Sequence, residues 1–402
     1  MVNGFPARHD MAFRIRDVRG VRMRAPGPDY WRGFLKQAAD AQATGRFQFS
    51  PPWRTVYAKE VESALVRVQL ADGTVGWGEA TCPIAPEVIC TLVNGFISEV
   101  ARHQPFAAPD TLVDMLYDAQ RCRGYLAGHY QDAVAALDIA LHDALARRAG
   151  CPVNELFAAK ARASQPCYLS GARAPTREER IELLHRWSAE ATTAVKIFLR
   201  GSLDADLEEF TALQDAVPSI SWWAGDALWT FHEPAVAVRA RHSFGQLAAK
   251  WLECPMLPED LAGHMALREA PGAPIALGEH FRTALQAAPW LDSGAVQILQ
   301  PDIGRTGFVM GRRMLEHASG RHIAVTPHMG GALDVMQAAT LHFAASIAAS
   351  DLPCEYQAGL AGRIPTALRS DWTLGHDGLL IPETPGLGVH VDEDAIQEFI
   401  VS

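Results

Sequence analysis

Six acidic or imidazole side chains recur along the second half of the chain, each at the end of a short apolar run. They are Asp226, Glu253, Glu279, Asp302, His328 and Glu355. Consecutive members are separated by 27, 26, 23, 26 and 27 residues, about the length of one strand, one helix and two turns. Parallel strands gather such side chains at one end of a barrel. Three acids followed by an Asp and a His would form a metal site with a base beside it.

Two earlier apolar runs extend this repeat toward the N-terminus. They are "PCYLSG" and "AVKIFLRG", and both lie between Ala161 and the run that ends at Asp226. With the six later runs they predict eight strands, the number that closes a parallel barrel filled by its own side chains. The segment after Glu355 predicts a short appended element rather than a further βα unit.

The N-terminal part of the chain predicts a different kind of structure. Residues 13–80 contain two alternating, β-branched runs and the hairpin signal Asp72-Gly73, which together predict antiparallel strands. Residues 86–160 predict helices. The clearest is "YQDAVAALDIALHDALARRAG", with apolar residues at three- and four-residue spacing and a stop at Gly150.

Residues 26–55 form a long segment rich in glycine, proline and aromatic side chains. Loops of such length are usually functional or disordered. We therefore hypothesise a lid that packs onto a bound ligand, with Tyr30 and Trp53 as candidate substrate contacts.

The composition limits the class of protein. The chain has 402 residues, of which 49% are hydrophobic and 20% charged, and its net charge of -10 argues against nucleic-acid and anionic-membrane partners. It contains seven cysteines without CxxC spacing, which is typical of buried thiols in a reducing compartment. Because neither a signal-peptide core nor a membrane-length apolar stretch is found, we expect a cytoplasmic protein.

Five motifs resemble the enolase superfamily, and within it the mandelate racemase branch. They are "ALDIALHDALARRAGCPVNELF", "LECPMLPEDL", "ALGEHF", "QPDIGRTG" and "VTPHMGG", in the family's order. The resemblance implies an α/β protein with a modified TIM barrel, (β/α)₇β. It implies an N-terminal α+β capping domain over 1–160, the barrel over 161–356, and a C-terminal segment over 357–402 that returns to the cap. It also implies a homo-oligomer, from dimer to octamer.

Asp226, Glu253 and Glu279 match the family's three metal-ligand positions. A single acid at a strand end is commonly solvated or caps a helix, but three at matching strand ends favour a metal site. Carboxylate oxygens suit Mg²⁺ better than Zn²⁺, so the resemblance implies one Mg²⁺ per subunit. Such a cation on a substrate carboxylate would stabilise the enediolate left by removal of the α-proton.

The resemblance also assigns acid–base roles. His328 matches the family's catalytic base, and Asp302 matches the carboxylate that orients it. Lys196 matches the first residue of a Lys-x-Lys pair, whose second lysine is replaced here by Phe198. Glu355 matches an acid that hydrogen-bonds the substrate carboxylate or the enediolate.

Further candidates for substrate contact are Arg200, His280 and Trp229. Alternation would place Arg200 on the side of Lys196 if the strand extends that far. The sequence is equally consistent with a surface arginine at the start of the following helix. His280 follows the third metal position directly. Leu228 stands where many relatives carry an asparagine, and Trp229 would shape the same wall.

With one good base, the simplest chemistry is loss of water from an acid sugar, an aldonate or aldarate, to give a 2-keto-3-deoxy acid. His328 itself could protonate the leaving hydroxyl, a syn route that needs only one acid–base residue. The small-molecule partner would then be a carboxylate. The alternative is a racemase or epimerase of a 2-hydroxy acid with Lys196 or a cap residue as the opposite base. A further alternative is a catalytically silent sugar-acid binding or regulatory protein.

Overall fold

The computed structural model describes the chain apart from residues 1–10, 28–41, 50–55, 158–161, 348–350 and 402. Tyr30 and Trp53 therefore lie outside the described residues, and the lid hypothesis stays a prediction.

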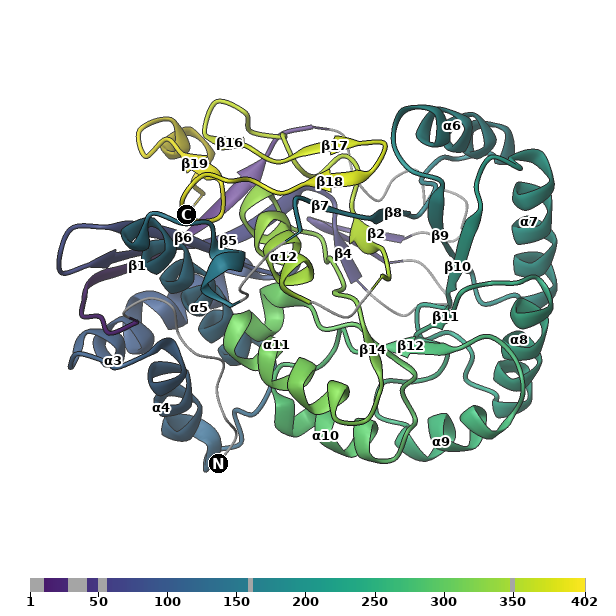
Figure 1. Cartoon of the computed structure of the whole chain (residues 1–402), viewed down its shortest axis with the longest axis horizontal. Coiled ribbons are helices and arrows are strands. Elements are labelled where there is room, and N and C mark those ends of the chain that lie inside the picture. Colours follow the sequence, from purple (N-terminus) through teal and green to yellow (C-terminus); the bar gives the residue numbers. More distant parts are fainter. Residues whose placement is uncertain (1–10, 28–41, 50–55, 158–161, 348–350, 402) are drawn as a thin grey trace.

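The second half of the chain forms a parallel barrel in which eight strands alternate with seven helices across the described residues (Figure 1). The strands, in sequence order, are β8 (Cys167–Ser170), β9 (Ala194–Phe198), β10 (Trp222–Asp226), β11 (Leu252–Glu253), β12 (Ile275–Leu277), β13 (Ile298–Leu299), β14 (Ala324–Val325) and β15 (Cys354–Tyr356). The helices are α6 (Arg177–Glu190), α7 (Leu203–Ala216), α8 (Pro234–Gln246), α9 (Leu261–Glu269), α10 (Ala284–Asp292), α11 (Ile303–Ser319) and α12 (Asp334–Ser346). The predicted (β/α)₇β barrel is confirmed.

The ladder of backbone hydrogen bonds runs from β14 through β13, β12, β11, β10, β9 and β8 to β15. Between its two ends, the Thr326 hydroxyl donates to the Pro353 carbonyl at 2.8 Å. A buried side-chain hydrogen bond thus links the two ends of the ladder, next to β14 and β15.

An apolar cluster fills the amino-terminal end of the barrel, and we call it the floor cluster. It consists of Tyr168, Ala194, Ala224, Trp251, Ala276 and Ile298. Trp222 packs against it, with ring centroids 4.6 Å from Trp251 and 5.4 Å from Tyr168. These large rings exclude water from beneath the polar residues that follow on the same strands.

The capping domain is built on an antiparallel sheet of β1 (Ile15–Ala25), β5 (Val61–Leu70) and β6 (Val75–Ala80). The turn between β5 and β6 contains the predicted Asp72-Gly73 hairpin signal. Part of the segment expected to be a loop instead forms a small sheet of β2 (Gln42–Thr44), β3 (Phe47–Phe49) and β4 (Val56–Ala58). Local antiparallel pairing supplies these backbone groups with hydrogen bonds, which a long loop would leave to water.

Helices cover the capping sheet: α2 (Pro86–Leu92), η1 (Val93–Ile97), α3 (Ser98–Arg102), α4 (Pro109–Arg121) and α5 (His129–Ala149). The predicted long helix is α5, and it ends at Gly150, which has the left-handed φ of 70°. Helix α5 is buried on nearly all sides because it lies between strand β6 and barrel helix α11. A Cβ at Gly78 would lie 2.0 Å from the Ala136 carbonyl of α5, so only glycine permits this close packing.

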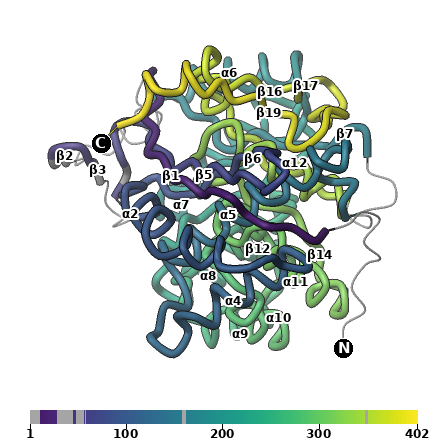
Figure 2. The backbone as a smooth tube through the Cα atoms, turned by 90° about the vertical axis from the view of Figure 1, so that its left-hand side faces the viewer, coloured from purple at the N-terminus to yellow at the C-terminus, as the bar shows by residue number. Residues whose placement is uncertain are grey.

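After the barrel, the chain runs back along the capping sheet (Figure 2). Its short elements are β16 (Leu368–Ser370), β17 (Thr373–Gly375), β18 (Gly378–Leu380), β19 (Val389–Val391) and η3 (Ala395–Phe399). Strand β18 pairs with β17 on one side and with β7 (Ser164–Gln165) on the other, and η2 (Val153–Leu156) follows α5. The Val401 amide donates to the Arg22 carbonyl at 3.0 Å, and Ile400 bridges to Met23 of β1. The last residues thereby add a backbone contact to the edge of the cap.

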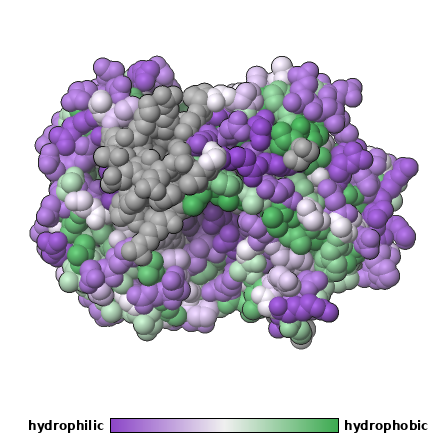
Figure 3. All heavy atoms as spheres, turned by 180° about the vertical axis from the view of Figure 1, so that it is seen from behind, coloured by the Kyte–Doolittle hydropathy of each residue, from purple (hydrophilic) through white to green (hydrophobic). Residues whose placement is uncertain are grey.

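On the face drawn in Figure 3, hydrophilic residues prevail and hydrophobic ones form scattered groups. None of the helices in the described part of the chain combines the length and apolarity needed to cross a bilayer.

Candidate active site at the carboxyl ends of the barrel strands

A polar layer lies directly above the floor cluster. Ser170, Lys196, Asp226, Glu253 and Gln300 each come two residues after a member of that cluster. Since side chains alternate along a strand, both sets point into the barrel, and the polar set stands nearer its carboxyl end. Each of these strands therefore places an apolar side chain in the floor cluster and, two residues later, a polar side chain in the buried layer above it.

Lys196 lies among three carboxylates. Its Nζ is 2.6 Å from Oε1 of Glu253, 3.0 Å from Oε1 of Glu355 and 3.3 Å from Oδ2 of Asp226. Burial favours the neutral amine, but the charges of Glu253 and Glu355 outweigh it and raise the pKa of Lys196 well above its usual value. In this arrangement the lysine is a positive charge held in place by three acids.

Other donors fix two of the acids. Glu253 accepts hydrogen bonds at Oε2 from Trp251 Nε1 at 3.0 Å and from Gln300 Nε2 at 2.7 Å. Glu279 accepts one at Oε1 from Trp229 Nε1 at 3.2 Å. Because these donors hold the carboxylates in place, little side-chain entropy remains to be lost when a ligand binds.

A tight turn follows Asp226 and brings Trp229 over the site. Leu228 and Trp229 both have left-handed backbone angles, with φ of 50° and 61°. Such angles are costly for residues other than glycine and concentrate at functional sites. The Leu228 amide donates to Oδ1 of Asp226 at 2.9 Å, and the Trp229 amide donates to the Cys254 carbonyl at 2.7 Å. The backbone of Leu228 therefore orients the Asp226 carboxylate.

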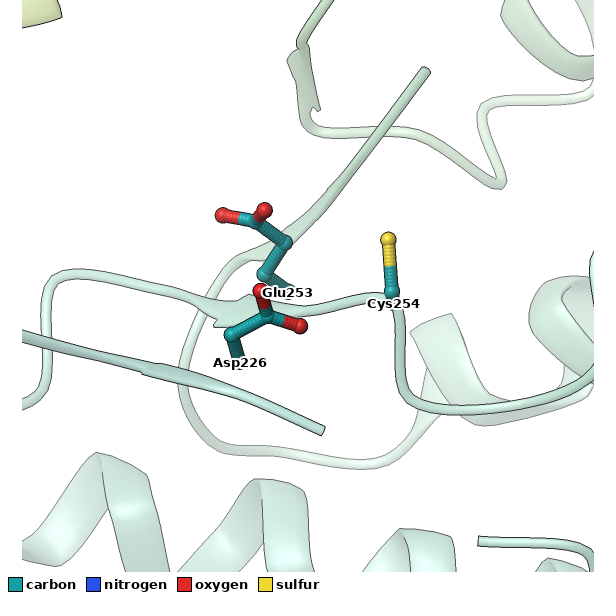
Figure 4. Close-up of side chains that lie close together, drawn as sticks. All are labelled: Asp226, Glu253 and Cys254. Carbon is teal, nitrogen blue, oxygen red and sulfur yellow. The ribbon is translucent and has the colours of Figure 1, made fainter. Parts of the chain in front are cut away.

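Two overlapping groups of ligand atoms meet at Glu253. Those of Asp226, Glu253 and Cys254 lie within 4.8 Å of one another (Figure 4), and so do those of Glu253, Glu279 and His328. Burial and the charge of Glu253 raise the pKa of Asp226 well above its usual value. A cation would relieve this crowding of buried acids, so the carboxylate oxygens fit a divalent metal. Burial also raises the pKa of the Cys254 thiol well above normal, which makes it a poor ligand because only the thiolate binds metal.

His328 and Asp302 form a buried dyad. His328 Nδ1 lies 2.8 Å from Asp302 Oδ2, and an isolated β-bridge joins the two backbones. Thr81 of the cap donates its hydroxyl to the other carboxylate oxygen of Asp302 at 2.7 Å. This pattern places the Nδ1 proton toward Asp302 and leaves Nε2 to face the site.

The Nε2 atom of His328 points at the carboxylate layer. It lies 2.8 Å from Oε2 of Glu279 and 3.8 Å from Oε2 of Glu355. Burial disfavours the charged imidazole, but the charges of Glu279 and Glu355 raise the pKa of His328 well above its usual value. Burial alone would raise the pKa of Glu279, but the neighbouring His328 imidazolium lowers it well below its usual value. His328 and Glu279, the candidate base and a candidate metal ligand, therefore share one face of the site.

The carboxylate of Glu355 is fully buried and accepts hydrogen bonds from three neighbours. It accepts the Ser170 hydroxyl at 2.5 Å, the Met329 amide at 2.9 Å and Gln357 Nε2 at 3.3 Å. Burial would raise the pKa of Glu355, but Lys196 and His328 lower it below its usual value. Glu355 is therefore a charged acceptor at the base of the site.

A cavity of about 370 Å³ lies between barrel and cap, and five of the charged residues described above border it: Lys196, Asp226, Glu279, His328 and Glu355. Its lining comprises Val56, Thr81, Cys82, Pro83, Ile84, His129, Asp132, Arg173, Lys196, Phe198, Asp226, Leu228, Trp229, Glu279, Arg282, Arg305, His328, Gly330, Gly331, Glu355 and Gln357. The volume suits a small polar molecule, and the lining supplies charged groups on every side.

The proposed substrate contacts are placed differently from one another. Trp229 lines the cavity. His280 packs behind it, with ring centroids 5.0 Å apart and both ring nitrogens buried, and burial lowers its pKa to about 3. His280 thus supports the wall as a neutral ring.

The expectation that Arg200 faces the substrate needs correction. Strand β9 ends at Phe198, so alternation does not carry on to Arg200. Its backbone amide donates to Oδ1 of Asp206, and the residue lines a separate cavity of about 300 Å³ beside α6 and α7. Phe198 borders both cavities and fills the position of the missing second lysine.

Sequence reasoning missed several charged residues of the cavity. Arg305 donates to the Glu279 carbonyl at 2.9 Å, and Arg282 donates to Oδ1 of Asp132 at 3.0 Å. Arg173 donates to Gln357 Oε1 at 2.7 Å. Arg282 and Arg305 each come three residues after an acid at a strand end, Glu279 and Asp302 respectively, and that offset is the signal that could have found them.

Two family models match the chain in sequence order. Residues 48–158 match the mandelate racemase / muconate lactonizing enzyme N-terminal domain, and residues 179–395 match a domain described as enolase C-terminal domain-like. The second match alone spans more than half of the chain.

Curated relatives and solved structures agree with these matches. The chain is 28% identical to a D-galactarolactone cycloisomerase of Agrobacterium fabrum, over 83% of this chain and 90% of the relative. It is 25% identical to an L-rhamnonate dehydratase of Saccharopolyspora erythraea, over 95% and 97%. The crystal structure of an enolase superfamily member from Agrobacterium tumefaciens superposes with a TM-score of 0.89 at 28% identity, covering 97% and 100%.

Proposed function

The chain belongs to the mandelate racemase / muconate lactonizing enzyme family of the enolase superfamily, and on that premise we propose that it dehydrates an acid sugar. Enzymes of this family abstract the proton α to a carboxylate. The observation that carries the proposal is the buried His328–Asp302 dyad, whose Nε2 faces the carboxylate layer within one cavity.

Asp226, Glu253 and Glu279 would hold one Mg²⁺ per subunit. When bound, the cation would supply positive charge to the carboxylate oxygens of the substrate, where charge develops as the α-proton leaves. A cation held by Glu279 would also offset the negative charge that keeps a proton on His328 Nε2, which now lies 2.8 Å from Oε2 of Glu279, and would leave that nitrogen free to accept the α-proton.

The chain's own residues would then perform the elimination. His328 takes the α-proton at Nε2 while Asp302 balances the imidazolium charge. Lys196 would fix the substrate carboxylate by its charge. Glu355 would hydrogen-bond that carboxylate after taking up a proton, which the negative charge of the substrate beside it favours. The β-hydroxyl leaves as water, and the resulting enol tautomerises to a 2-keto-3-deoxy acid.

Two features favour elimination over racemisation. Phe198 replaces the second lysine, and Lys196 is held by three carboxylates that keep it protonated. Racemisation requires a base on each face of the α-carbon, and neither residue is suited to be one here. The similarity to an L-rhamnonate dehydratase supports the same choice.

A library of aldonic acids, aldaric acids and their lactones, incubated with the protein and Mg²⁺, tests the proposal. We expect a 2-keto acid from at least one member, detected as its semicarbazone. Lactones belong in the library because one relative is a galactarolactone cycloisomerase. Running hits in D₂O separates the alternatives, since an epimerase gives deuterated diastereomers without keto acid. A library that gives no keto acid would overturn the proposal.

A further inference from the structure

A second histidine–carboxylate pair lies on the cap side of the same cavity. His129 is the first residue of α5, and its Nδ1 lies 3.6 Å from Oδ2 of Asp132. Both residues line the cavity that His328 also lines. The pair repeats the arrangement of His328 and Asp302 from the opposite domain.

Asp132 is fixed firmly enough to orient a ring. Its side chain is 2% exposed, and Arg282 of the barrel donates to its Oδ1 at 3.0 Å. This ion pair spans the cap and the barrel, so Asp132 keeps its place whether or not His129 is present. A separation of 3.6 Å is longer than a hydrogen bond, but such contacts commonly tighten when substrate binds.

His129 is accessible from the cavity. Its side chain is 39% exposed, in contrast to the buried His328. Its two polar contacts, with Asp132 and with Cys82 Sγ at 3.8 Å, are both made by Nδ1, and Nε2 accepts or donates no hydrogen bond within the described residues. Nε2 is therefore the nitrogen available to a ligand.

Cys82 does not compete for this role. Its thiol donates to the Ile84 carbonyl at 2.9 Å, and burial raises its pKa to about 12. Cys82 therefore stays a neutral thiol beside the ring, and Asp132 is the group that can balance an imidazolium at His129.

The elimination needs an acid for its leaving hydroxyl, because hydroxide is a very poor leaving group. Phe198 carries no proton, and Lys196 is held by Glu253, Glu355 and Asp226 in the polar layer. His328 could return the abstracted proton only to a hydroxyl on its own face of the substrate, so a hydroxyl on the opposite face needs a second acid. His129 lies at the start of cap helix α5 and lines the same cavity as Lys196 and His328.

We propose that His129 is the catalytic acid that protonates the departing β-hydroxyl, an inference that rests on the proposed dehydration. His328 removes the α-proton, and the electron pair of that C–H bond forms the carbon–carbon double bond. The β C–O bond breaks with its pair on oxygen, which takes the Nε2 proton of His129 and leaves as water. Solvent then removes a proton from His328 and returns one to His129, and the cycle closes.

Substitution of His129 should separate removal of the α-proton from loss of the β-hydroxyl. The probe is the library member that the wild-type protein dehydrates fastest. For His129→Asn we expect keto-acid formation to fall by about 10²-fold or more. In D₂O the recovered substrate should carry deuterium at the α-carbon, because proton removal by His328 remains intact while expulsion is slow. His328→Asn is the matched control and should lose both activities.

A substrate analogue with fluoride in place of the β-hydroxyl gives a second readout. Fluoride leaves without a proton, so His129→Asn should eliminate it at close to the wild-type rate. A purely structural role for His129 would slow both substrates alike.

Three results would decide against the proposal. Dehydration by His129→Asn at the wild-type rate would overturn it and leave the proposed function standing. Equal losses of dehydration and α-proton exchange would overturn it as well, because an acid that acts after proton removal leaves exchange intact. Absence of keto acid from the wild-type protein would overturn the dehydration itself, and with it the step that His129 serves.

Discussion

At the scale of single residues, chemical role follows from the partners of each side chain. His328 and His280 are both histidines close to Glu279, yet their surroundings give them opposite properties. Carboxylates surround His328 and raise its pKa well above the usual value, whereas aromatic rings surround His280 and burial lowers its pKa to about 3. Of these two histidines, His328 alone has a carboxylate on one ring nitrogen and the site on the other.

The first prediction concerns His328. His328→Gln should lower kcat/KM for dehydration by about 10² to 10⁴-fold, the usual contribution of a positioned base, with little change in fold. Steady-state kinetics and circular dichroism measure the two effects. The control is His317→Gln, because His317 lies on the outer helix α11 and pairs with Asp292 far from the cavity lining. Comparable activity in the two variants would remove His328 from the mechanism.

At the scale of elements, the cap and the barrel are held together by buried polar contacts at helix ends. Glu79 of β6 accepts hydrogen bonds from the Leu333 amide at 2.6 Å and the Met336 amide at 2.9 Å, at the start of barrel helix α12. A carboxylate at a helix N-terminus satisfies free amides and the helix dipole. The contact also positions the Met329 turn, which leads from His328 into α12.

The second prediction uses the pH dependence of this contact. Burial raises the pKa of Glu79 from 4.5 to about 7. The folded protein then keeps a proton that the unfolded chain releases, so stability falls as pH rises from about 4.5 through 7. Chemical denaturation across this range should show a smaller decline for Glu79→Gln than for wild type. Identical slopes for the two proteins would contradict the assignment.

The third prediction concerns the packing of α5 on β6. In Gly78→Ala the added methyl meets the Ala136 carbonyl, and the helix must shift, which should destabilise the fold by about 1 to 3 kcal/mol. Gly95→Ala is the control, because a Cβ there meets no atom within 4 Å. Urea denaturation measures both, and equal stability of the two variants would show that α5 is free to move.

At the scale of the whole molecule, neither domain contains the complete site. The barrel contributes the carboxylate layer and the dyad, while the cap contributes Thr81, His129 and Asp132 to the same cavity. The Thr81 hydroxyl reaches Asp302, and Arg282 reaches Asp132 in return. These reciprocal contacts make catalytic geometry depend on how the two domains pack.

The fourth prediction concerns metal binding. Mg²⁺ should raise the thermal unfolding midpoint, because it offsets the repulsion among Asp226, Glu253 and Glu279 and binds only the folded chain. At a hundredfold excess over its Kd the gain is about 2.7 kcal/mol. Scanning fluorimetry with MgCl₂ measures the shift. Glu253→Gln should abolish it, since Glu253 belongs to both ligand groups, and a shift of wild-type size in that variant would place the metal elsewhere.

The expectations that failed share one cause. Arg200 was placed by extending strand alternation, but the strand ends two residues earlier. Residues 42–49 were expected in a loop and instead form strands with β4. In both cases the end of an element was decided by backbone hydrogen bonds to segments that periodicity does not reveal.

The sequence by itself determined the barrel and the order of its strand-end residues, because polar side chains at near-constant spacing must fall at equivalent places in repeated βα units. It also determined that a second lysine is absent, since Phe198 stands at that position. Only the tertiary structure decided which charges touch. Lys196 lies among Asp226, Glu253 and Glu355, and His129 lines the same cavity as His328, because contacts between residues 30 to 159 positions apart depend on packing rather than on local pattern.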